Sequence, residues 1–326
     1  MVRCLRNTAG VLLAVVWIST AAQQTLAQDP DDGAPTFTVS DLPVGRPLRI
    51  VVYGDMRFTD PSNTSDTDPG VRKWLAQKVG EEKPDILLLT GDMPFHGSNP
   101  ADWKIYSQET ALWTQERLRI YPTIGNHEEL PDPIGGMKNY FAAYPQLERH
   151  NYYSVQMGNI YLITLDSSSI RDWKQRRWLD AQLDHLPSSA DFIFFLFHLP
   201  LVSDLQTAFM VGIPDPPTLD LRHDIEARAA ASHAKFVIFN GHIHNYERFE
   251  MNGVTHVISG GGGARPYPIF IRGDQDLYRF RTYPNFNYVV ITMEGKHAEA
   301  KMYRVVDPDS EKRSVELQDT FSLNAK

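Results

Sequence analysis

Cysteine is nearly absent from the sequence: Cys4 is the single cysteine in 326 residues. One thiol cannot build an internal disulfide framework or a thiolate metal site, because both need several cysteines. The chain also has little basic charge, with 32 Lys and Arg against 40 Asp and Glu and a formal net charge of −8. These basic residues form no cluster along the sequence. The composition therefore argues against a protein that coats nucleic acid, which normally carries a basic patch.

Long apolar runs are absent beyond the N-terminal region. Ala9–Ser19 is apolar, follows the basic residues Arg3 and Arg6, and precedes a stretch of small residues. This is the layout of a secretory signal peptide. The alternative, a membrane anchor, is disfavoured because the run is shorter than the roughly 20 residues that a spanning helix needs. We predict a signal peptide over residues 1–27, whose cleavage removes Cys4, and a secreted or periplasmic product without a stable membrane span.

The rest of the chain divides into a short lead-in and one predicted domain. Residues 28–47 are rich in Asp, Pro, Gly and Thr, which indicates an irregular lead-in or linker. A single domain is predicted over residues 48–326. Its first half alternates short apolar runs with helical segments, and its second half contains pairs of strands. That order indicates an α/β (α+β) fold of two packed β-sheets flanked by helices, not one doubly wound sheet.

The individual elements are predicted from hydrophobic periodicity and turn residues. Buried strands are expected at Leu48–Tyr53, Ile86–Thr90, Arg119–Ile124, Asp191–Phe197 and Lys235–Phe239. Helices are expected at Val71–Gly80, Ala101–Arg117, Asp172–Leu186 and Asp224–Ser232. Further strands are expected at Tyr152–Val155, Ile160–Leu165, Phe249–Met251, Val254–Ser259, Tyr288–Met293, Ala298–Val305 and Val315–Leu323. Long loops rich in Pro and Gly are expected at Glu129–Lys138, Ser203–Arg222 and Gly260–Gln275.

Each of the five buried strands is followed by a residue with a polar, metal-binding type of side chain. These residues are Asp55, Asp92, Asn126 with His127, His198, and His242 with His244. The functional crevice of an open α/β sheet lies outside the carboxyl ends of its strands. Five strand ends therefore deliver carboxylate, amide and imidazole groups to one place. Such a donor set can hold metal ions.

Five motifs, in this order, carry a resemblance to a known family. They are Gly54-Asp55, Gly91-Asp92, Gly125-Asn126-His127-Glu128, His198 and Gly241-His242-Ile243-His244. Together they resemble the calcineurin-like metallophosphoesterase superfamily, from Leu48 to Val305. The segments Asn245–Arg248 and Ser259–Gly263 resemble the purple acid phosphatase branch in particular. The resemblance implies a four-layer αββα sandwich of two mixed β-sheets and a metal-dependent hydrolase of phosphate esters.

The resemblance further implies two divalent or trivalent metal ions that share Asp92. One metal takes Asp55, Asp92 and His244, and the other takes Asp92, Asn126, His198 and His242. A carboxylate can bridge two cations, whereas an imidazole cannot. Nitrogen and oxygen donors without cysteine suit Fe, Mn, Zn or Ni, and the sequence does not choose among these metals.

The resemblance also assigns residues to a small phosphorylated substrate. His127 is expected to contact the phosphate or to protonate the leaving group, with Glu128 orienting its ring, and Asn126 is expected to contact the substrate. His96, which closely follows the second motif, and His223, at the end of a long loop, are further candidates for substrate contact. For these last two histidines the alternative is an ordinary packed or surface residue.

Two residues depart from the family pattern. Many family members have a histidine two residues after the first Asp, where this chain has Arg57. Arginine has no lone pair to donate to a metal, so we predict that Arg57 clamps the substrate phosphate. The alternatives are that Arg57 partly replaces the first metal, or that it turns outward into a surface ion pair. Phe95 stands where purple acid phosphatases have the tyrosine whose phenolate binds ferric iron.

The predicted function is a secreted phosphomonoesterase, similar to acid phosphatases, which hydrolyses phosphate esters with metal-activated water at a two-metal centre. A phosphodiesterase or nucleotidase with the same centre is the alternative within this chemistry. An alternative of another class is a metal-binding interaction protein with little turnover, because Arg57 replaces a ligand histidine. The sequence predicts neither the natural substrate nor the oligomeric state.

Overall fold

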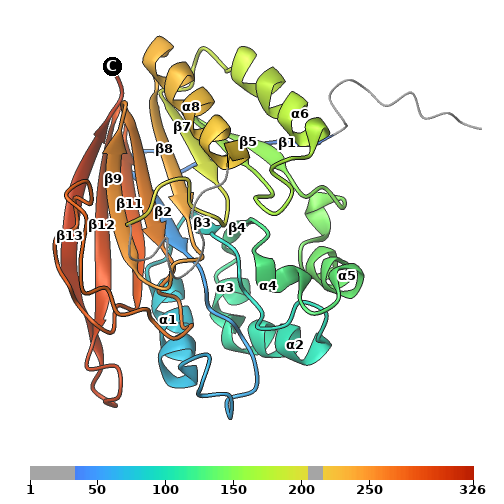
Figure 1. Ribbon diagram of the computed structural model, residues 1–326, viewed down its shortest axis with the longest axis vertical. Helices are drawn as coiled ribbons and strands as arrows, with labels where there is room; N and C mark the ends of the chain where they lie inside the picture. The colour runs from blue at the N-terminus through green and yellow to red at the C-terminus, as the bar shows by residue number, and fades with distance from the viewer. Residues whose placement is uncertain (1–33, 205–215) are drawn as a thin grey trace, which may run out of the picture.

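The computed structural model describes residues 34–204 and 216–326, in which two β-sheets pack between helices (Figure 1). The seven-stranded sheet has the order β1-β5-β6-β7-β8-β10-β9, and the six-stranded sheet has the order β13-β12-β11-β2-β3-β4. Both sheets are mixed. In the seven-stranded sheet, β6 pairs antiparallel with β5 and parallel with β7, which in turn is parallel to β8. In the six-stranded sheet, β2 pairs antiparallel with β11 and parallel with β3, which in turn is parallel to β4. The predicted αββα sandwich of two mixed sheets is confirmed.

The bounds of the elements are as follows. The strands are β1 (Thr36–Val39), β2 (Leu48–Tyr53), β3 (Ile86–Leu89), β4 (Arg119–Pro122), β5 (Tyr153–Met157), β6 (Ile160–Thr164), β7 (Phe192–Leu196), β8 (Lys235–Asn240), β9 (Tyr246–Met251), β10 (Val254–Ser259), β11 (Asn287–Glu294), β12 (His297–Val306) and β13 (Ser314–Asn324). The helices are α1 (Pro69–Glu81), α2 (Pro100–Glu109), α3 (Ala111–Gln115), α4 (Asn126–Glu129), α5 (Pro133–Ala143), the 3₁₀ turn η1 (Pro145–Leu147), α6 (Trp173–Asp184) and α8 (Pro216–Ala231).

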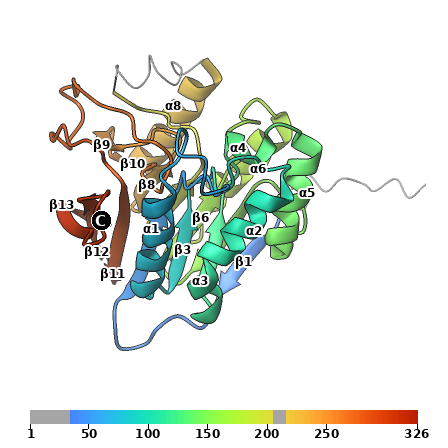
Figure 2. The same cartoon turned by 90° about the horizontal axis from the view of Figure 1, so that it is seen from below.

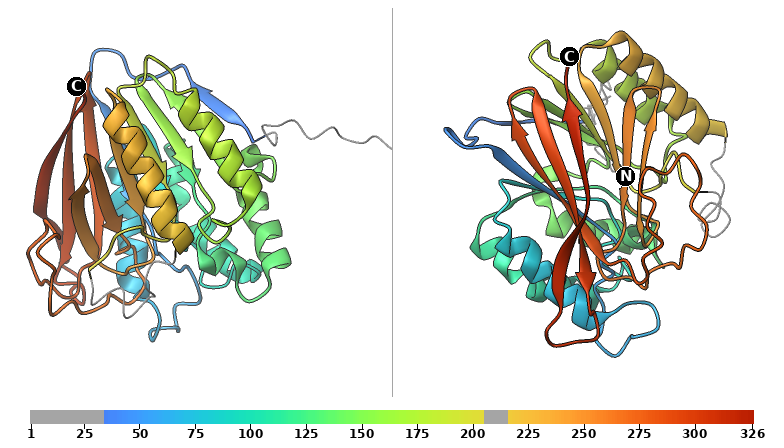
Figure 3. Two further views of the ribbon diagram at one scale, coloured as in Figure 1. Left: turned by 45° about the horizontal axis from the view of Figure 1, so that its top comes forward. Right: turned by 90° about the vertical axis from the view of Figure 1, so that its left-hand side faces the viewer.

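The side chains of the seven-stranded sheet alternate between its two faces, as the pleat of a strand requires. On β7, Phe192 and Phe194 belong to the large core between the sheets. The intervening Ile193 belongs to a second apolar cluster with Trp178 of α6 and Ile225 of α8. Figure 3, left, shows α6 and α8 side by side over this face, and Figure 2 shows α1, α2 and α3 on the other side of the molecule. The four layers thus bury both faces of the strands that carry the candidate site.

All five strands predicted from apolar runs are present, with ends that differ by at most two residues. Within each sheet they run parallel, so their carboxyl ends lie at one edge. The two edges meet, because Nδ1 of His198, which follows β7, lies 2.9 Å from the carbonyl oxygen of Thr90, which follows β3. The predicted meeting of polar strand ends is therefore confirmed by contacts between the sheets.

Two segments predicted to be irregular are regular. Within the predicted lead-in over residues 28–47, Thr36–Val39 forms β1, which pairs in parallel with β5 and joins Thr36 to Ser154 through their hydroxyls at 2.8 Å. Within the predicted loop Glu129–Lys138, helix α5 begins at Pro133. The Asp132 carboxylate caps this helix by accepting hydrogen bonds from the backbone of its first turn. Long-range pairing and a helix cap therefore overrode the local Pro and Gly content.

Two predicted helices have different bounds. The expected helix Ala101–Arg117 is interrupted at Thr110, whose hydroxyl donates to the carbonyl of Tyr106 at 2.7 Å and ends α2. The expected helix Asp224–Ser232 begins eight residues earlier, so α8 includes residues assigned to the loop Ser203–Arg222. Proline at the first helical positions, here Pro216, suits a helix start because it has no amide hydrogen to leave unbonded.

The predicted signal peptide, residues 1–27, lies outside the described residues, as does the part of the long loop at residues 205–215. Among the helices of residues 34–204 and 216–326, none combines the length and apolar character that a membrane span requires.

A buried histidine beneath α8 gives the fold a predicted acid sensitivity. His256 on β10 is 1% exposed, and within the described structure neither ring nitrogen has a hydrogen-bond partner. Burial, with smaller contributions from Arg222 and Lys235, lowers the pKa of His256 to about 3. In the unfolded chain the pKa of histidine is about 6.5. Below that pH the unfolded chain binds a proton that the folded chain does not, so the free energy of unfolding falls as the pH drops from 6.5 towards 3. The loss is about 2 kcal/mol at pH 5.

The variant His256→Leu tests this expectation because leucine fills a similar volume and does not titrate. Its unfolding free energy, measured in urea at pH 7 and pH 5, is expected to fall less between the two pH values than that of the wild type, by about 2 kcal/mol. Replacement of the exposed His185 by Gln is the control for loss of a histidine that is not buried. Equal pH dependence of His256→Leu and wild type would contradict the expectation.

Candidate metal centre

The strand ends that form the candidate site have unusual backbone conformations. Asp55, Arg57, Asp92 and His242 have positive φ angles of 58°, 52°, 54° and 68°. Non-glycine residues rarely adopt this left-handed conformation, which costs on the order of 1–3 kcal/mol each and is concentrated at functional sites. The turns therefore bend sharply after the strands and direct these side chains to the meeting edge of the two sheets.

Two glycines let the neighbouring loops close on the carboxylates. A Cβ atom at Gly125 would lie 2.3 Å from Oδ1 of Asp92, and one at Gly241 would lie 2.3 Å from Oδ2 of Asp55. No side chain fits at these distances. The Gly-Asn-His and Gly-His-x-His motifs thus need glycine because their backbones touch the carboxylates of the other two motifs.

Asp55, Asp92 and His244 form the first donor cluster. One ligand atom from each of these buried residues lies within 4.8 Å of the others. His244 donates from Nδ1 to the carbonyl of Arg265 at 2.9 Å, which leaves a lone pair on Nε2. This Nε2 atom is buried, lies 3.7 Å from Oδ1 of Asp55, and has no hydrogen-bond partner in the described structure. A buried acceptor aimed at two carboxylates fits a metal ion.

The second donor cluster consists of Asn126, His198 and His242, next to Asp92. Oδ1 of Asn126 lies 3.1 Å from Nε2 of His198 and 3.1 Å from Nδ1 of His242, and these two nitrogens are 3.2 Å apart. Nε2 of His198 is also 3.3 Å from Oδ1 of Asp92. The Thr90 carbonyl accepts from Nδ1 of His198 and so directs Nε2 inward. An amide oxygen and two imidazole nitrogens at such short separations fit a second metal ion.

The pKa shifts of the donor residues show why a cation fits. Burial acts to raise the pKa of Asp92, but His198, His127 and Arg57 outweigh it and hold this pKa well below its usual range. Burial acts to lower the pKa of His198, yet Asp92 and Asp55 raise it to about 9. Burial and the nearby Asp92 raise the pKa of Asp55 well above its usual range. The raised pKa values of His198 and Asp55 indicate an excess of buried negative charge, which a metal ion would neutralise.

Arg57 points into the centre and not outward. Its Nη2 donates to Oδ2 of Asp92 at 3.3 Å, and its side chain is 14% exposed. Burial and, next, the positive charge of Arg57 hold the pKa of His244 well below its usual range. The alternative of a surface ion pair for Arg57 is therefore wrong. The guanidinium lies beside the first donor cluster, where it adds positive charge close to the position of a metal.

His127 lies at the edge of the centre. Its backbone amide donates to Oδ1 of Asp92 at 2.9 Å, and Nδ1 donates to the carbonyl of Phe95 at 2.6 Å. Nε2 is then the nitrogen that faces the centre, 4.0 Å from Oδ2 of Asp92. The Phe95 carbonyl, not the Glu128 carboxylate, orients the His127 ring.

Glu128 has a different task from the predicted one. Its fully buried carboxylate accepts hydrogen bonds from the amides of Asp92, Met93 and Gly125, at 2.9, 2.8 and 2.6 Å. Burial and the nearby Asp92 raise the pKa of Glu128 to about 7. The expectation that Glu128 orients His127 is corrected: Glu128 joins the turn after β3 to the turn after β4. The motif marks Glu128 as a candidate site residue, but the sequence does not reveal that its carboxylate accepts hydrogen bonds from backbone amides.

The two further histidine candidates differ in position. The His96 ring lies against Phe95 with centroids 4.4 Å apart, and Phe95 in turn contacts the His127 ring at 5.4 Å. His96 is thus at the rim, on the His127 side. His223 is exposed on α8, which covers the outer face of the seven-stranded sheet, and the described contacts do not bring it to the donor clusters.

Fold and donor set together are those of a metallophosphoesterase. Residues 48–260 match the family described as calcineurin-like phosphoesterase, and the chain belongs to this family. The chain is 24% identical over 301 residues to purple acid phosphatase 22 of Arabidopsis thaliana, covering 85% of this chain and 64% of that protein. It is 29% identical over 127 residues to a probable glycerophosphodiester phosphodiesterase of Arcobacter nitrofigilis, covering 36% of this chain and 43% of that protein. The chain thus spans less than two thirds of the length of these relatives.

Solved structures share the fold. A purple acid phosphatase from yellow lupin (Lupinus luteus) seeds superposes with a TM-score of 0.65 at 17% identity, covering 85% of this chain and 54% of that one. GAP50, described as the anchor in the inner membrane complex of Plasmodium, superposes with a TM-score of 0.59 at 16% identity, covering 86% and 90%. At these identities the likeness concerns the fold alone.

Proposed function

We propose that the chain is an exported, metal-dependent phosphomonoesterase with a centre for two metal ions. The observation that carries the proposal is the convergence of two donor clusters on the shared, fully buried Asp92. Asp55 and His244 complete one cluster, and Asn126, His198 and His242 complete the other. Export is inferred from the signal-peptide layout of residues 1–27.

We infer that residues 48–326 form one catalytic domain, to whose seven-stranded sheet β1 of the predicted lead-in also belongs. Strand β2, which begins at Leu48, lies between β3 and the much later β11 in one sheet. The first donor cluster likewise joins Asp55 and Asp92 to His244. Early and late parts of the chain are therefore needed for the same sheet and the same cluster.

When bound, two metal ions in such a centre supply Lewis-acid polarisation of the phosphate and a water nucleophile of lowered pKa. The chain itself supplies Arg57, whose guanidinium donates to Asp92 in the structure and would donate hydrogen bonds to the phosphate oxygens of a bound substrate. Asn126, a donor of the second cluster, contacts the same phosphate. His127 presents Nε2 to the centre and delivers a proton to the leaving oxygen.

A monoester is the first choice of substrate because Arg57 and two metal ions together complement a phosphate dianion. The purple acid phosphatases among the relatives support this choice. A phosphodiesterase is the second candidate, supported by the local identity with the glycerophosphodiester phosphodiesterase. A metal-binding interaction protein with little turnover is the candidate of another class, supported by the Arg57 guanidinium beside the first cluster.

Metal analysis combined with two chromogenic substrates separates these functions. The purified protein is dialysed free of metal, titrated with Zn²⁺, Mn²⁺ or Fe²⁺, and assayed with 4-nitrophenyl phosphate and bis(4-nitrophenyl) phosphate. A monoesterase binds two ions and has the higher kcat/KM on the monoester. A higher kcat/KM on the diester would identify the phosphodiesterase. Metal binding without hydrolysis of either substrate would favour the interaction protein.

Replacement of Arg57 by Ala is predicted to have opposite effects on substrate and metal. Loss of charge-assisted hydrogen bonds, worth about 1.5–3 kcal/mol, should lower kcat/KM on the monoester by about 10- to 150-fold. Removal of a positive charge beside Asp92 should at the same time tighten metal binding. Arg57→Lys is the matched control, which keeps the charge but cannot donate two parallel hydrogen bonds. Unchanged KM, kcat and metal affinity in Arg57→Ala would rule out the assigned role.

A further inference from the structure

The loop that follows β10 encloses His244, the imidazole of the first donor cluster. The carbonyl of Arg265 accepts from Nδ1 of His244 at 2.9 Å, and the amide of Tyr267 donates to the His244 carbonyl at 2.9 Å. The Tyr267 ring stacks on the imidazole, with centroids 4.4 Å apart and an angle of 16° between the planes. One hydrogen bond fixes the direction of the imidazole, and the aromatic ring fixes its plane.

Asn245, next in sequence, holds this loop against His244. Its side chain is fully buried, and Nδ2 donates to the carbonyl of Tyr267 at 2.7 Å. Oδ1 accepts from Nη2 of Arg272 at 3.2 Å, from Nδ2 of Asn285 at 3.1 Å and from the amide of Tyr246 at 2.8 Å. The backbone of Tyr267 is thus bound through its amide to His244 and through its carbonyl to Asn245.

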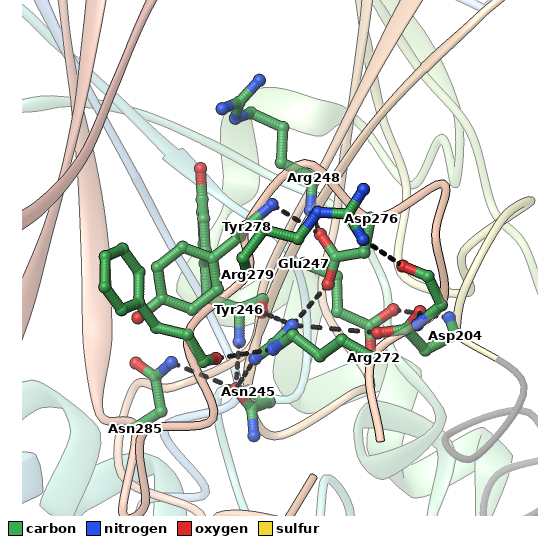
Figure 4. A network of polar contacts seen from close by, with 12 residues as sticks. Asp204, Asn245, Tyr246, Glu247, Arg248, Arg272, Asp276, Tyr278, Arg279 and Asn285 are labelled. Carbon is green, nitrogen blue, oxygen red and sulfur yellow. Dashed lines mark hydrogen bonds and ion pairs between the residues drawn. The ribbon is translucent and has the colours of Figure 1, made fainter. Parts of the chain in front are cut away.

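Arg272 anchors the far side of the same loop, as Figure 4 shows. Its Nη1 donates to Asp276 at 2.5 Å and to the carbonyl of Tyr246 at 2.9 Å, and its Nε donates to the carbonyl of Phe280 at 2.7 Å. The guanidinium also lies over the Tyr278 ring, 4.7 Å from its centroid. With its side chain 2% exposed, Arg272 is a rigid support for Asn245 and, through Asn245, for Tyr267.

We propose that Tyr267 is a positioning residue for the first metal: its ring holds the His244 imidazole in the plane that directs Nε2 to Asp55 and Asp92. This inference rests on the proposed function. The first cluster has three protein ligands, against four for the second, and Arg57 adds a repelling charge beside it. Its affinity for a metal therefore depends strongly on how well His244 is preorganised. Partners outside the ligand sphere typically contribute about 10- to 100-fold in metal affinity.

The variants Tyr267→Leu and Tyr267→Phe separate the ring from the hydroxyl. Phenylalanine keeps the stacked plane, whereas leucine removes it, and Tyr267→Met is a second variant without a ring. Each metal-free protein is titrated with Zn²⁺ by calorimetry, and its thermal unfolding is recorded. Tyr283→Leu, in the same loop and 57% exposed, is the control for loss of a tyrosine. We expect Tyr267→Leu and Tyr267→Met to weaken one of the two binding steps by about 10- to 100-fold, and Tyr267→Phe and Tyr283→Leu to weaken neither.

Several results would overturn the inference. Equal weakening of both steps in Tyr267→Leu would indicate a general disturbance of the centre, and no weakening would remove the role of the ring. Weakening in Tyr267→Phe as large as in Tyr267→Leu would transfer the role to the hydroxyl. The wild-type titration is read first: fewer than two bound ions contradicts the proposed function itself. Two bound ions together with unaffected leucine and methionine variants would contradict only the role of Tyr267.

Discussion

Asp92→Asn is expected to release both metal ions and to lower kcat/KM on a phosphomonoester by about 10³-fold or more, since a single preorganised charge-stabilising group is already worth 10²–10³. Both carboxylate oxygens of Asp92 have partners. Oδ1 lies next to His198 and accepts a hydrogen bond from the amide of His127, and Oδ2 accepts one from Nη2 of Arg57. Asparagine keeps one oxygen and presents an NH₂ group where the other was. It is also neutral, so it can neither bridge two cations nor balance His198 and Arg57.

The measurement for Asp92→Asn is metal content by mass spectrometry after loading and dialysis, with steady-state kinetics on 4-nitrophenyl phosphate. Asp274→Asn is the matched control, because the Asp274 side chain is fully exposed to solvent. Circular dichroism and thermal unfolding of the metal-free proteins verify that both variants fold. An Asp92→Asn protein that retains two ions per chain would show that Asp92 does not bridge them.

His127→Ala is expected to keep both ions and to lose about 10²–10⁴-fold in kcat, the usual contribution of a positioned general acid. The imidazole has no place in either donor cluster, since Nδ1 is occupied by the Phe95 carbonyl and Nε2 lies 4.0 Å from Asp92. Its removal therefore leaves the donors of both ions in place. The part of His127 that does bond Asp92 is the backbone amide, which alanine retains.

A leaving-group series distinguishes proton donation from phosphate contact. If His127 donates the proton, His127→Ala should lose most activity on alkyl phosphates, whose leaving groups need a proton, and least on 4-nitrophenyl phosphate. His233→Ala, which changes an exposed histidine, is the control. Loss of metal from His127→Ala would place this residue among the ligands and contradict its assigned role.

The strands and the polar positions at their ends could be predicted because both depend on local sequence. An apolar run such as Ile86–Thr90 is buried on both faces, and Gly91-Asp92 directly behind it marks the strand end. Strand β1 could not be predicted in the same way. Its four residues are stable only through pairing with β5, more than one hundred residues away in sequence.

The parts of the candidate centre that escaped prediction all depend on backbone geometry or on distant contacts. The contact of Arg57 with Asp92, unlike its predicted inward direction, depends on a left-handed turn at Arg57. The carboxylate of Glu128 bonds amides of a loop formed by another strand. The stacking of Tyr267 on His244 depends on the path of the intervening hairpin and loop. None of these three contacts leaves a periodic or compositional pattern in the sequence.

The position of β2 in its sheet also fixes when the centre can come into existence. Val52 of β2 pairs with Val289 of β11, and the amide of Ala264 donates to the carbonyl of Asp55 at 2.9 Å. Asp55 is synthesised early, and more than two hundred further residues must be added before both Ala264 and Val289 are present. Until then the nascent chain carries carboxylates and imidazoles that are not yet fixed in the two donor clusters. A fragment that ends before His242 therefore lacks a donor of each cluster and cannot complete either of them.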